Sequence, residues 1–345
     1  MPGTIFGMPF DAEIFGSMWR ETPDPVLTAM FDSGAVMNDP TIGGLISNGS
    51  DIYTVPFYNP LDGDPSNHDG QTDIVATEVA GTSMTGCVFG RDRAFFSRDF
   101  TAELAKNDPQ GHIARAVSRY WAKQKQKEMI NTLTGIFKVT GSGNDKLFHD
   151  NHIVDLGSTT GTPYEIGVND DKDAATKALG DNRDKFTLVF MHSVIANRLE
   201  KQQVLEYWKY TDAMGIQRNT NLASWGGKTV IVDDGVPAAK VGGSGANKDL
   251  MAYHTYMLGS GAIRYSEAAP LEEPAESYRE PLKNGGQSTL ITRTRMTMHP
   301  NGFTFVKPAS GYVNSATRAQ LALAASWKTA FNHKALPFVD IVTNG

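Results

Sequence analysis

Around residue 108 the spacing of apolar positions changes from the alternation typical of strands to the spacing of a long helix. Asp108 is a favourable helix-capping residue and Pro109 suits the first helical position, and neither glycine nor proline recurs between 114 and 134. The pattern predicts one helix over 108–137, about 45 Å long and far above the mean helix length of about 11–12 residues.

The predicted helix changes character along its length. Apolar residues line one face at its start and again at its end: Ile113, Val117, Tyr120 and Trp121, then Met129, Ile130, Leu133 and Phe137. Residues 123–128, between them, are polar on every side. A helix that is apolar at both ends and polar in the middle is not typical of the core of a compact enzyme. We interpret it as a strut.

The residues before this helix predict an arm and a β-hairpin. Residues 1–38 show only short apolar pieces, so we expect an extended arm with one or two helical turns. Residues 51–58 are β-branched and aromatic, and Pro56 indicates an edge strand. A turn-rich loop follows over 59–70, and 73–79 and 84–96 alternate as returning strand. Because a two-stranded ribbon is marginal alone, we expect the hairpin to pack on another chain.

The residues after the helix mix both types of secondary structure. The patterns predict helices over 171–179, 192–203 and 317–327, and strands over 185–191, 228–232, 251–257, 288–298, 303–306 and 337–342. The strands do not alternate with helices as regularly as in a doubly wound sheet, so the predicted fold class is α+β. The length of 345 residues favours about two domains.

The amino-acid composition limits the classes of function that the chain can have. The net charge of −6 disfavours a sequence-independent grip on DNA across the whole surface, although it leaves local basic faces open. The single cysteine, Cys87, excludes an intramolecular disulfide and fits a reducing compartment. No apolar run reaches the roughly 18 residues of a membrane span, and the N-terminus lacks a basic start. We therefore expect synthesis in the cytoplasm.

Several near-motifs for phosphate, nucleophile or metal chemistry are incomplete. The glycine-rich segment 242–248 fails the phosphate-loop spacing, and 81–86 misses the nucleophile elbow by one residue. His149 and His152 lack further zinc ligands. The acidic segment 169–173 lacks the glycine and final glutamate of a calcium loop, and we interpret it as charge that complements a helix dipole.

Three side chains remain as candidates for catalysis. Cys87 lies in an apparent strand without a cationic partner, so we expect a structural thiol. His192 stands at a helix start, where capping or packing is the simpler role. We predict no enzyme, no cofactor and no metal site, and keep a soluble hydrolase that uses Cys87 or Ser83 as a contrasting hypothesis.

Five groups of segments, in order over nearly the whole chain, carry a resemblance to a known family. The first two are Phe31-Asp-Ser-Gly-Ala-Val36 with Val55-Pro-Phe57 and Leu61-Asp-Gly-Asp64, and Asp108-Pro109 with Ile113, Val117, Tyr120-Trp121 and Thr134-Gly-Ile-Phe137. The others are Leu179-Gly-Asp-Asn182 with Met191-His-Ser193, Arg295-Met-Thr-Met-His-Pro-Asn-Gly-Phe303, and 317–327 with Leu336-Pro337 and Val342-Thr-Asn344. Together these segments resemble a tailed-bacteriophage major capsid (coat) protein of the Johnson fold.

The resemblance implies a domain plan. It places an N-terminal arm at 1–48 and an extended β-hairpin loop at 49–100. A peripheral domain with the spine helix covers 101–139 and 261–314, and an axial domain covers 140–260 and 315–345. Coats of one subfamily are cross-linked through a hairpin lysine, but 51–100 contains no lysine, so we do not expect that chemistry.

The resemblance also implies a function. It predicts self-assembly through hexamers and pentamers into an icosahedral head, which encloses double-stranded DNA without sequence-specific binding. Scaffolding, portal and decoration proteins are possible partners, no membrane is involved, and the protein is expected in the virion after assembly in the host cytoplasm. A bacterial nanocompartment shell with the same fold is the alternative.

The hairpin region supplies the residues expected to contact neighbouring subunits: Tyr53, Phe57, Arg91, Arg93 and Phe95. Two of them, Arg91 and Arg93, together with Pro56, would also discourage uncontrolled pairing of exposed strand edges.

Overall fold

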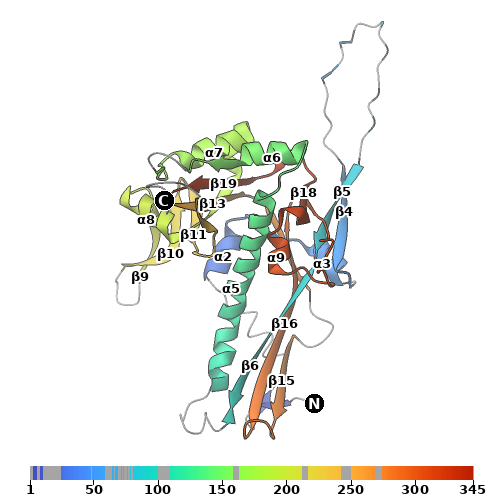
Figure 1. Ribbon diagram of the computed structural model, residues 1–345, viewed down its shortest axis with the longest axis vertical. Helices are drawn as coiled ribbons and strands as arrows, with labels where there is room; N and C mark the ends of the chain where they lie inside the picture. Colours follow the sequence, from blue (N-terminus) through green and yellow to red (C-terminus); the bar gives the residue numbers. More distant parts are fainter. Residues whose placement is uncertain are drawn as a thin grey trace.

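The computed structural model describes residues 3–5, 8–10, 25–47, 49–58, 64–65, 67–68, 71, 73, 76, 78, 81–99, 109–157, 163–211, 217–241, 250–268 and 274–344. Figure 1 shows an elongated subunit. A long helix and a narrow sheet extend downward from a broader part that contains a second, larger sheet.

The long helix is confirmed as α5, Pro109–Phe137, of 29 residues. Its C-terminal half lies in the main core with Met129, Leu133 and Ile136, and its start packs Val117 and Trp121 on the narrow sheet. The middle is less open to water than the sequence predicted, because Glu128 is fully buried and Lys125 pairs with Glu267.

The narrow sheet holds β3 (Val36–Asn38), β6 (Phe89–Arg98), β14 (Ile263–Ala268), β15 (Ala275–Glu280) and β16 (Gln287–Pro300). β16 lies between β6 on one side and β15 followed by β14 on the other. The Trp121 indole of α5 donates to Thr292 Oγ1 at 3.2 Å, which fixes the helix on one face of this sheet.

The β-hairpin is shorter than predicted. β4 (Ile52–Tyr58) pairs with β5 (Gly81–Cys87), and the ladder runs from Ile52 opposite Cys87 to Tyr58 opposite Gly81. Residues 89–98, predicted within the returning strand, instead form β6 and pair with β16. Of the predicted strand 73–79 the structure describes Asp73, Ala76 and Glu78, which lie outside any strand.

The arm also departs from expectation. β1 (Gly3–Ile5) pairs with β2 (Met8–Phe10), and α2 (Pro25–Asp32) and α3 (Pro40–Ser47) are full helices. α2 fits the one or two helical turns expected in the arm, but 25–47 packs on the body of the subunit and is not extended. Met30 belongs to the main core, and β3 runs parallel to β14. Gly34, with φ +71°, allows the turn from α2 into β3, a conformation that glycine adopts without strain.

The larger sheet has the order β7-β19-β13-β8-β11-β10-β9, with β12 on β13. Its strands are β7 (Ile153–Asp155), β8 (Phe186–Met191), β9 (Glu206–Thr211), β10 (Gln217–Trp225), β11 (Lys228–Val232), β12 (Ala238–Lys240), β13 (Met251–Gly259) and β19 (Phe338–Thr343). Alternate residues of β8 enter different cores: Leu188 joins the α5 side, and Val189 joins the side with α7 and α8. The mixed composition confirms the α+β class.

Helices α6 (Asn144–His152), α7 (Asp170–Leu179) and α8 (Ser193–Lys201) flank this sheet, with α6 and α7 along its upper side in Figure 1. Short 3-10 turns occur at Gly180–Lys185, Ala324–Ser326 and His333–Ala335. The strands predicted over 185–191, 228–232, 251–257 and 337–342 are confirmed as β8, β11, β13 and β19.

The helix predicted over 317–327 is wrong beyond its first turn. α9 spans Arg318–Leu321, and the chain then extends into β18 (Trp327–Thr329), which pairs with β17 (Phe303–Phe305). Trp327 explains the change, because its indole donates to the Leu321 carbonyl at 2.8 Å and its ring is buried against Phe305. Tertiary packing overrides the local helix propensity here.

Two histidines are buried in surroundings that disfavour the protonated form of the imidazole. His152 and His299 are 0% and 1% exposed, and burial lowers the pKa of each to about 4. Neither ring nitrogen of His299 makes a hydrogen bond of normal geometry, and its ring lies between those of Tyr53 and Trp327. In the unfolded chain both pKa values return to about 6.5.

This burial predicts acid sensitivity. As pH falls from about 6.5 to 4, each of these histidines binds a proton in the unfolded state but not in the folded state. Each histidine therefore lowers the free energy of unfolding by about 3 kcal/mol over this range. Urea unfolding of the subunit at pH 7.5 and at pH 4.5 measures the loss. In His299→Leu the loss between the two pH values should shrink by roughly half; an unchanged loss contradicts the assignment.

Candidate assembly interface

The hairpin is attached to its own subunit at its base. Tyr53 of β4 is 6% exposed, and its hydroxyl lies 3.2 Å from Thr297 Oγ1 of β16. Burial raises the pKa of Tyr53, so the hydroxyl stays protonated. Phe57, farther along the strand, packs edge-on against Phe331 with ring centroids 4.6 Å apart. These contacts hold the ladder in place near both of its ends.

Arg91 is engaged in a buried ion-pair network. Its Nε and Nη2 lie 2.7 and 3.1 Å from the two carboxylate oxygens of Glu128, and Nη2 also donates to the Ala316 carbonyl at 2.8 Å. Arg318 Nε donates to the same Glu128 carboxylate at 2.8 Å. The fully buried Glu128 therefore joins β6, α5 and the start of α9.

The other two predicted contact residues lie along β6. Arg93 is exposed, and Phe95 is half-buried against the edge of Tyr120. The structure thus gives Tyr53 and Arg91 their main partners within their own chain. A contact of these five residues with a neighbouring subunit stays a prediction, and Arg93 presents the most side chain for one.

Sequence reasoning missed an exposed aromatic row on the narrow sheet. Phe96 of β6, Thr289 of β16 and Tyr278 of β15 are directly opposite one another across three strands. Phe96 and Tyr278 are each 55% exposed, because α5 covers the other face. The register of β6 on β16 was needed to find this row, and sequence alternation alone did not supply it.

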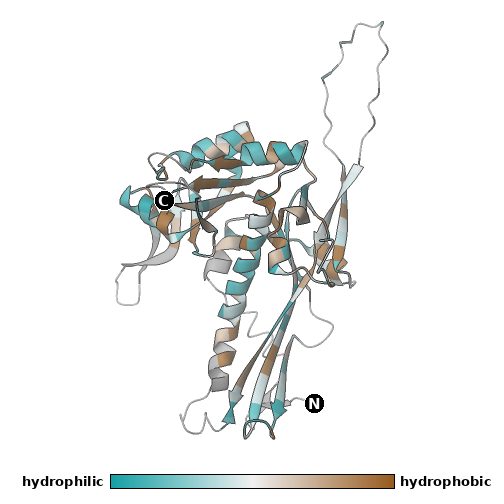
Figure 2. Cartoon of the chain, viewed as in Figure 1, coloured by the Kyte–Doolittle hydropathy of each residue, from teal (hydrophilic) through white to brown (hydrophobic). Residues whose placement is uncertain are grey.

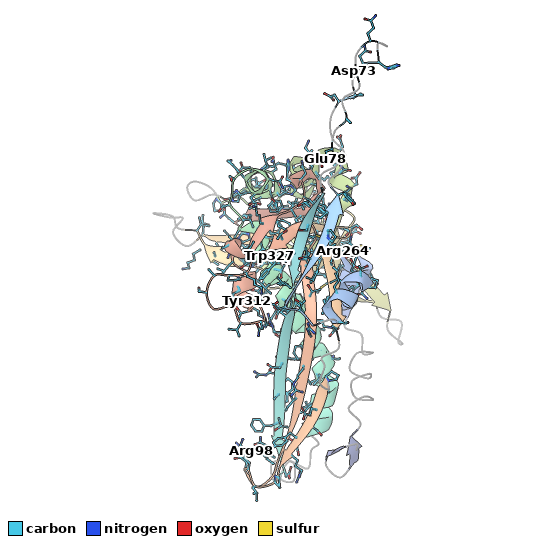
Figure 3. The ribbon with its side chains drawn as sticks, turned by 90° about the vertical axis from the view of Figure 1, so that its right-hand side faces the viewer. Asp73, Glu78, Arg98, Arg264, Tyr312 and Trp327 are labelled. Atoms are coloured by element: carbon cyan, nitrogen blue, oxygen red, sulfur yellow. The ribbon has the colours of Figure 1, made fainter. Side chains whose placement is uncertain are left out.

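The tip of the hairpin leaves the body of the subunit. Tyr58, the last residue of β4, is 79% exposed, and every described side chain between 64 and 78 is exposed. Figure 3 shows Asp73 well beyond the rest of the molecule, and Glu78 close to its upper edge. Residues 59–80 carry five carboxylates and no lysine or arginine. The exposed side chains of this tip are accessible to another chain.

Two open hollows border the base of the hairpin and β6. One, of about 770 Å³, is lined by residues that include Asp51, Arg91, Asp92, Arg293 and Arg295. The other, of about 500 Å³, includes Arg93, Tyr120 and Arg318. Neither lining includes histidine or cysteine. Arginine side chains contribute to both linings.

The candidate nucleophiles are poorly placed. Cys87 is 2% exposed, and burial raises the pKa of its thiol to about 12, so the thiolate that attack requires is scarcely formed. Ser83 is exposed on β5 opposite Pro56 in the hairpin ladder. His192 caps α8, with its ring nitrogen accepting from the Val194 N–H at 3.2 Å, as the sequence predicted.

The candidate ligand clusters have structural roles. His152 Nδ1 bonds the Phe338 carbonyl at 2.7 Å, and Asp171 forms a buried ion pair with Lys228 at 2.6 Å. Asp170, Asp171 and Asp173 occupy the first turn of α7, as predicted. Within the described ranges no group of histidine, cysteine and carboxylate residues is arranged to hold a metal ion. The segment 242–248 lies outside the described residues.

Comparison with known proteins agrees with the resemblance found in the sequence. No protein-family model matches the chain. The major capsid protein of Bacillus phage SPP1 is 29% identical over 316 residues, which are 91% of this chain and 90% of that protein. The capsid of Ralstonia phage GP4 superimposes with a TM-score of 0.51 at 12% identity, over 86% of this chain and 84% of that one. The cyanophage Pam1 capsid gives a TM-score of 0.50 at 12% identity, over 86% and 85%.

These similarities define the class of fold: it is the fold of tailed-phage capsid proteins. The chain is similar to a tailed-phage major capsid protein over nearly its whole length, and the resemblance found in the sequence is confirmed. In the part of the chain that the structure describes, no helix is long and apolar enough to cross a membrane.

Proposed function

We propose that this protein is a major capsid protein, which self-assembles into the shell of a phage head. The observation that carries the proposal is the similarity to the SPP1 major capsid protein over nine-tenths of both chains. The fold shared with the GP4 and Pam1 capsids supports it independently. These comparisons favour a phage coat over a nanocompartment shell.

The finer proposal is that hexamers and pentamers of the subunit close into an icosahedral head around double-stranded DNA. Closed symmetric arrangement repeats each modest interface many times, which makes the whole shell stable. The domain plan and the five hairpin contacts belong to this proposal, as do assembly in the host cytoplasm and partners such as scaffolding, portal and decoration proteins.

The subunit has surfaces suited to this role. The exposed tip at 64–78 can reach a neighbour, and the aromatic row of Phe96 and Tyr278 is a type of side chain enriched at protein interfaces. Arg93 can pair with carboxylates on an adjacent copy.

Negative-stain electron microscopy of the purified protein tests the proposal. We expect thin-walled shells, or rings of subunits that close when a scaffolding protein is added. A monomer that stays monodisperse at every concentration contradicts the proposal. A portal or terminase gene beside the coding sequence supports a phage head, whereas a cargo-enzyme gene there supports the nanocompartment.

A further inference from the structure

The exposed side of α5 carries a row of positive charge. Arg119, Lys123 and Lys127 are exposed, and they follow one another at four-residue spacing. Residues at this spacing share one face of a helix. Val117 and Trp121 pack on the narrow sheet, so the row lies on the side of α5 that is turned away from it. We call Arg119, Lys123 and Lys127 the basic row.

Among the residues that the structure describes, no ion pair neutralises the basic row. Glu128 is the one acidic residue in the sequence of α5, and its carboxylate is buried between Arg91 and Arg318. None of the three cations forms an ion pair with a described residue, whereas the neighbouring Lys125 is paired with Glu267. Figure 2 shows the hydrophilic middle of the helix where the row lies.

α5 and the narrow sheet together form a slab. On the face of this slab opposite the basic row, positive and negative side chains are balanced. The side chains that share the outer face of the narrow sheet include Arg98, Arg293 and Arg295, with Asp92, Glu276 and Glu280. Arg293 is paired with Glu276 at 3.0 Å, and Arg295 donates to the Ser50 carbonyl. The slab therefore has one cationic face and one neutral face, in a chain whose net charge is −6.

We propose that the basic row faces the interior of the shell and contacts the phosphate backbone of packaged duplex DNA. This proposal rests on the proposed function. Duplex DNA is the occupant that the charge favours, because exposed lysine and arginine bind phosphates by releasing counterions, independently of sequence. Three charges per subunit give weak contacts, which a shell repeats over its whole inner wall and which still let the genome leave.

The experiment compares duplex binding by two matched triple variants of the full-length protein. R119Q/K123Q/K127Q removes the basic row, and K172Q/R183Q/K201Q removes one arginine and two lysines that are exposed on the helical side of the larger sheet. Unassembled subunits are titrated into a fluorescent 30-base-pair duplex by anisotropy between 50 and 200 mM salt. Electron microscopy of each variant records whether shells form.

We expect the first variant to reduce the slope of log affinity against log salt by about 3, since each phosphate contact contributes about 0.9, and the second to leave it nearly unchanged. Both variants should form shells. Equal losses in the two variants, or no loss in the first, overturn the proposal. Intact DNA binding with failed assembly in the first variant also overturns it and assigns the row to contact between copies. Failure of the wild-type protein to form shells argues instead against the proposed function.

Discussion

Deleting residues 59–70 should abolish efficient shell formation while leaving the subunit folded. The described side chains between 64 and 78 are all exposed, and the ladder from Ile52–Cys87 to Tyr58–Gly81 lies outside the deletion. A shorter loop changes the free energy of unfolding by less than about 1 kcal/mol. Loss of one interface that recurs in every subunit should lower the shell yield at least about tenfold. Urea unfolding and quantitative electron microscopy measure the two effects.

A length-matched control separates the effect of the loop's length from the effect of its side chains. Replacing 59–70 by twelve glycine and serine residues restores the span but removes Asp62, Asp64 and Asp69. If side-chain contacts matter, this variant should assemble as poorly as the deletion. Normal shells from the deletion itself would remove the hairpin from the account of assembly.

Arg91→Ala should be the most destabilising single change among the predicted contact residues, at about 3 kcal/mol. It leaves the buried Glu128 carboxylate with Arg318 as its one remaining charged partner and frees the Ala316 carbonyl. Breaking a buried ion pair by removing one member costs more than the pair itself contributes, because the remaining charge stays desolvated. Urea unfolding of the isolated subunit measures the loss.

Two further variants test whether the loss comes from the buried ion pair. Arg93→Ala, two residues along the same strand and exposed, should change the free energy of unfolding by less than about 0.5 kcal/mol. The double variant R91A/E128L should be more stable than Arg91→Ala, since it removes the stranded carboxylate. Equal losses for Arg91→Ala and Arg93→Ala would show that the network adds no stability.

The elements with strong local signals were predictable from the sequence. For α5 the sequence offers Asp108 as a capping residue, a proline at the first helical position and a long stretch free of glycine and proline, and the buried strands β8 and β19 are largely apolar. The order of resemblances along the chain was also sufficient to identify the fold.

Features that depend on distant partners were not predictable. The apolar alternation of 84–96 is the same whether the strand pairs within the hairpin or with β16, and pairing with β16 decides the outcome. The segment 317–327 is rich in good helix formers. Burial of Trp327 against Phe305 nevertheless holds the end of this segment in an extended conformation. The ion pair between Arg91 and the buried Glu128 on α5 was not predictable either, because no spacing rule connects those two positions.

The central claim is that the tip of the hairpin, residues 59–80, gains its packing partners from adjacent copies. Hydrogen exchange of peptides from this segment, compared between isolated subunits and assembled shells, tests it most directly. We expect fast exchange in the subunit and at least about tenfold slower exchange in the shell. Equal exchange rates in the two states would contradict it.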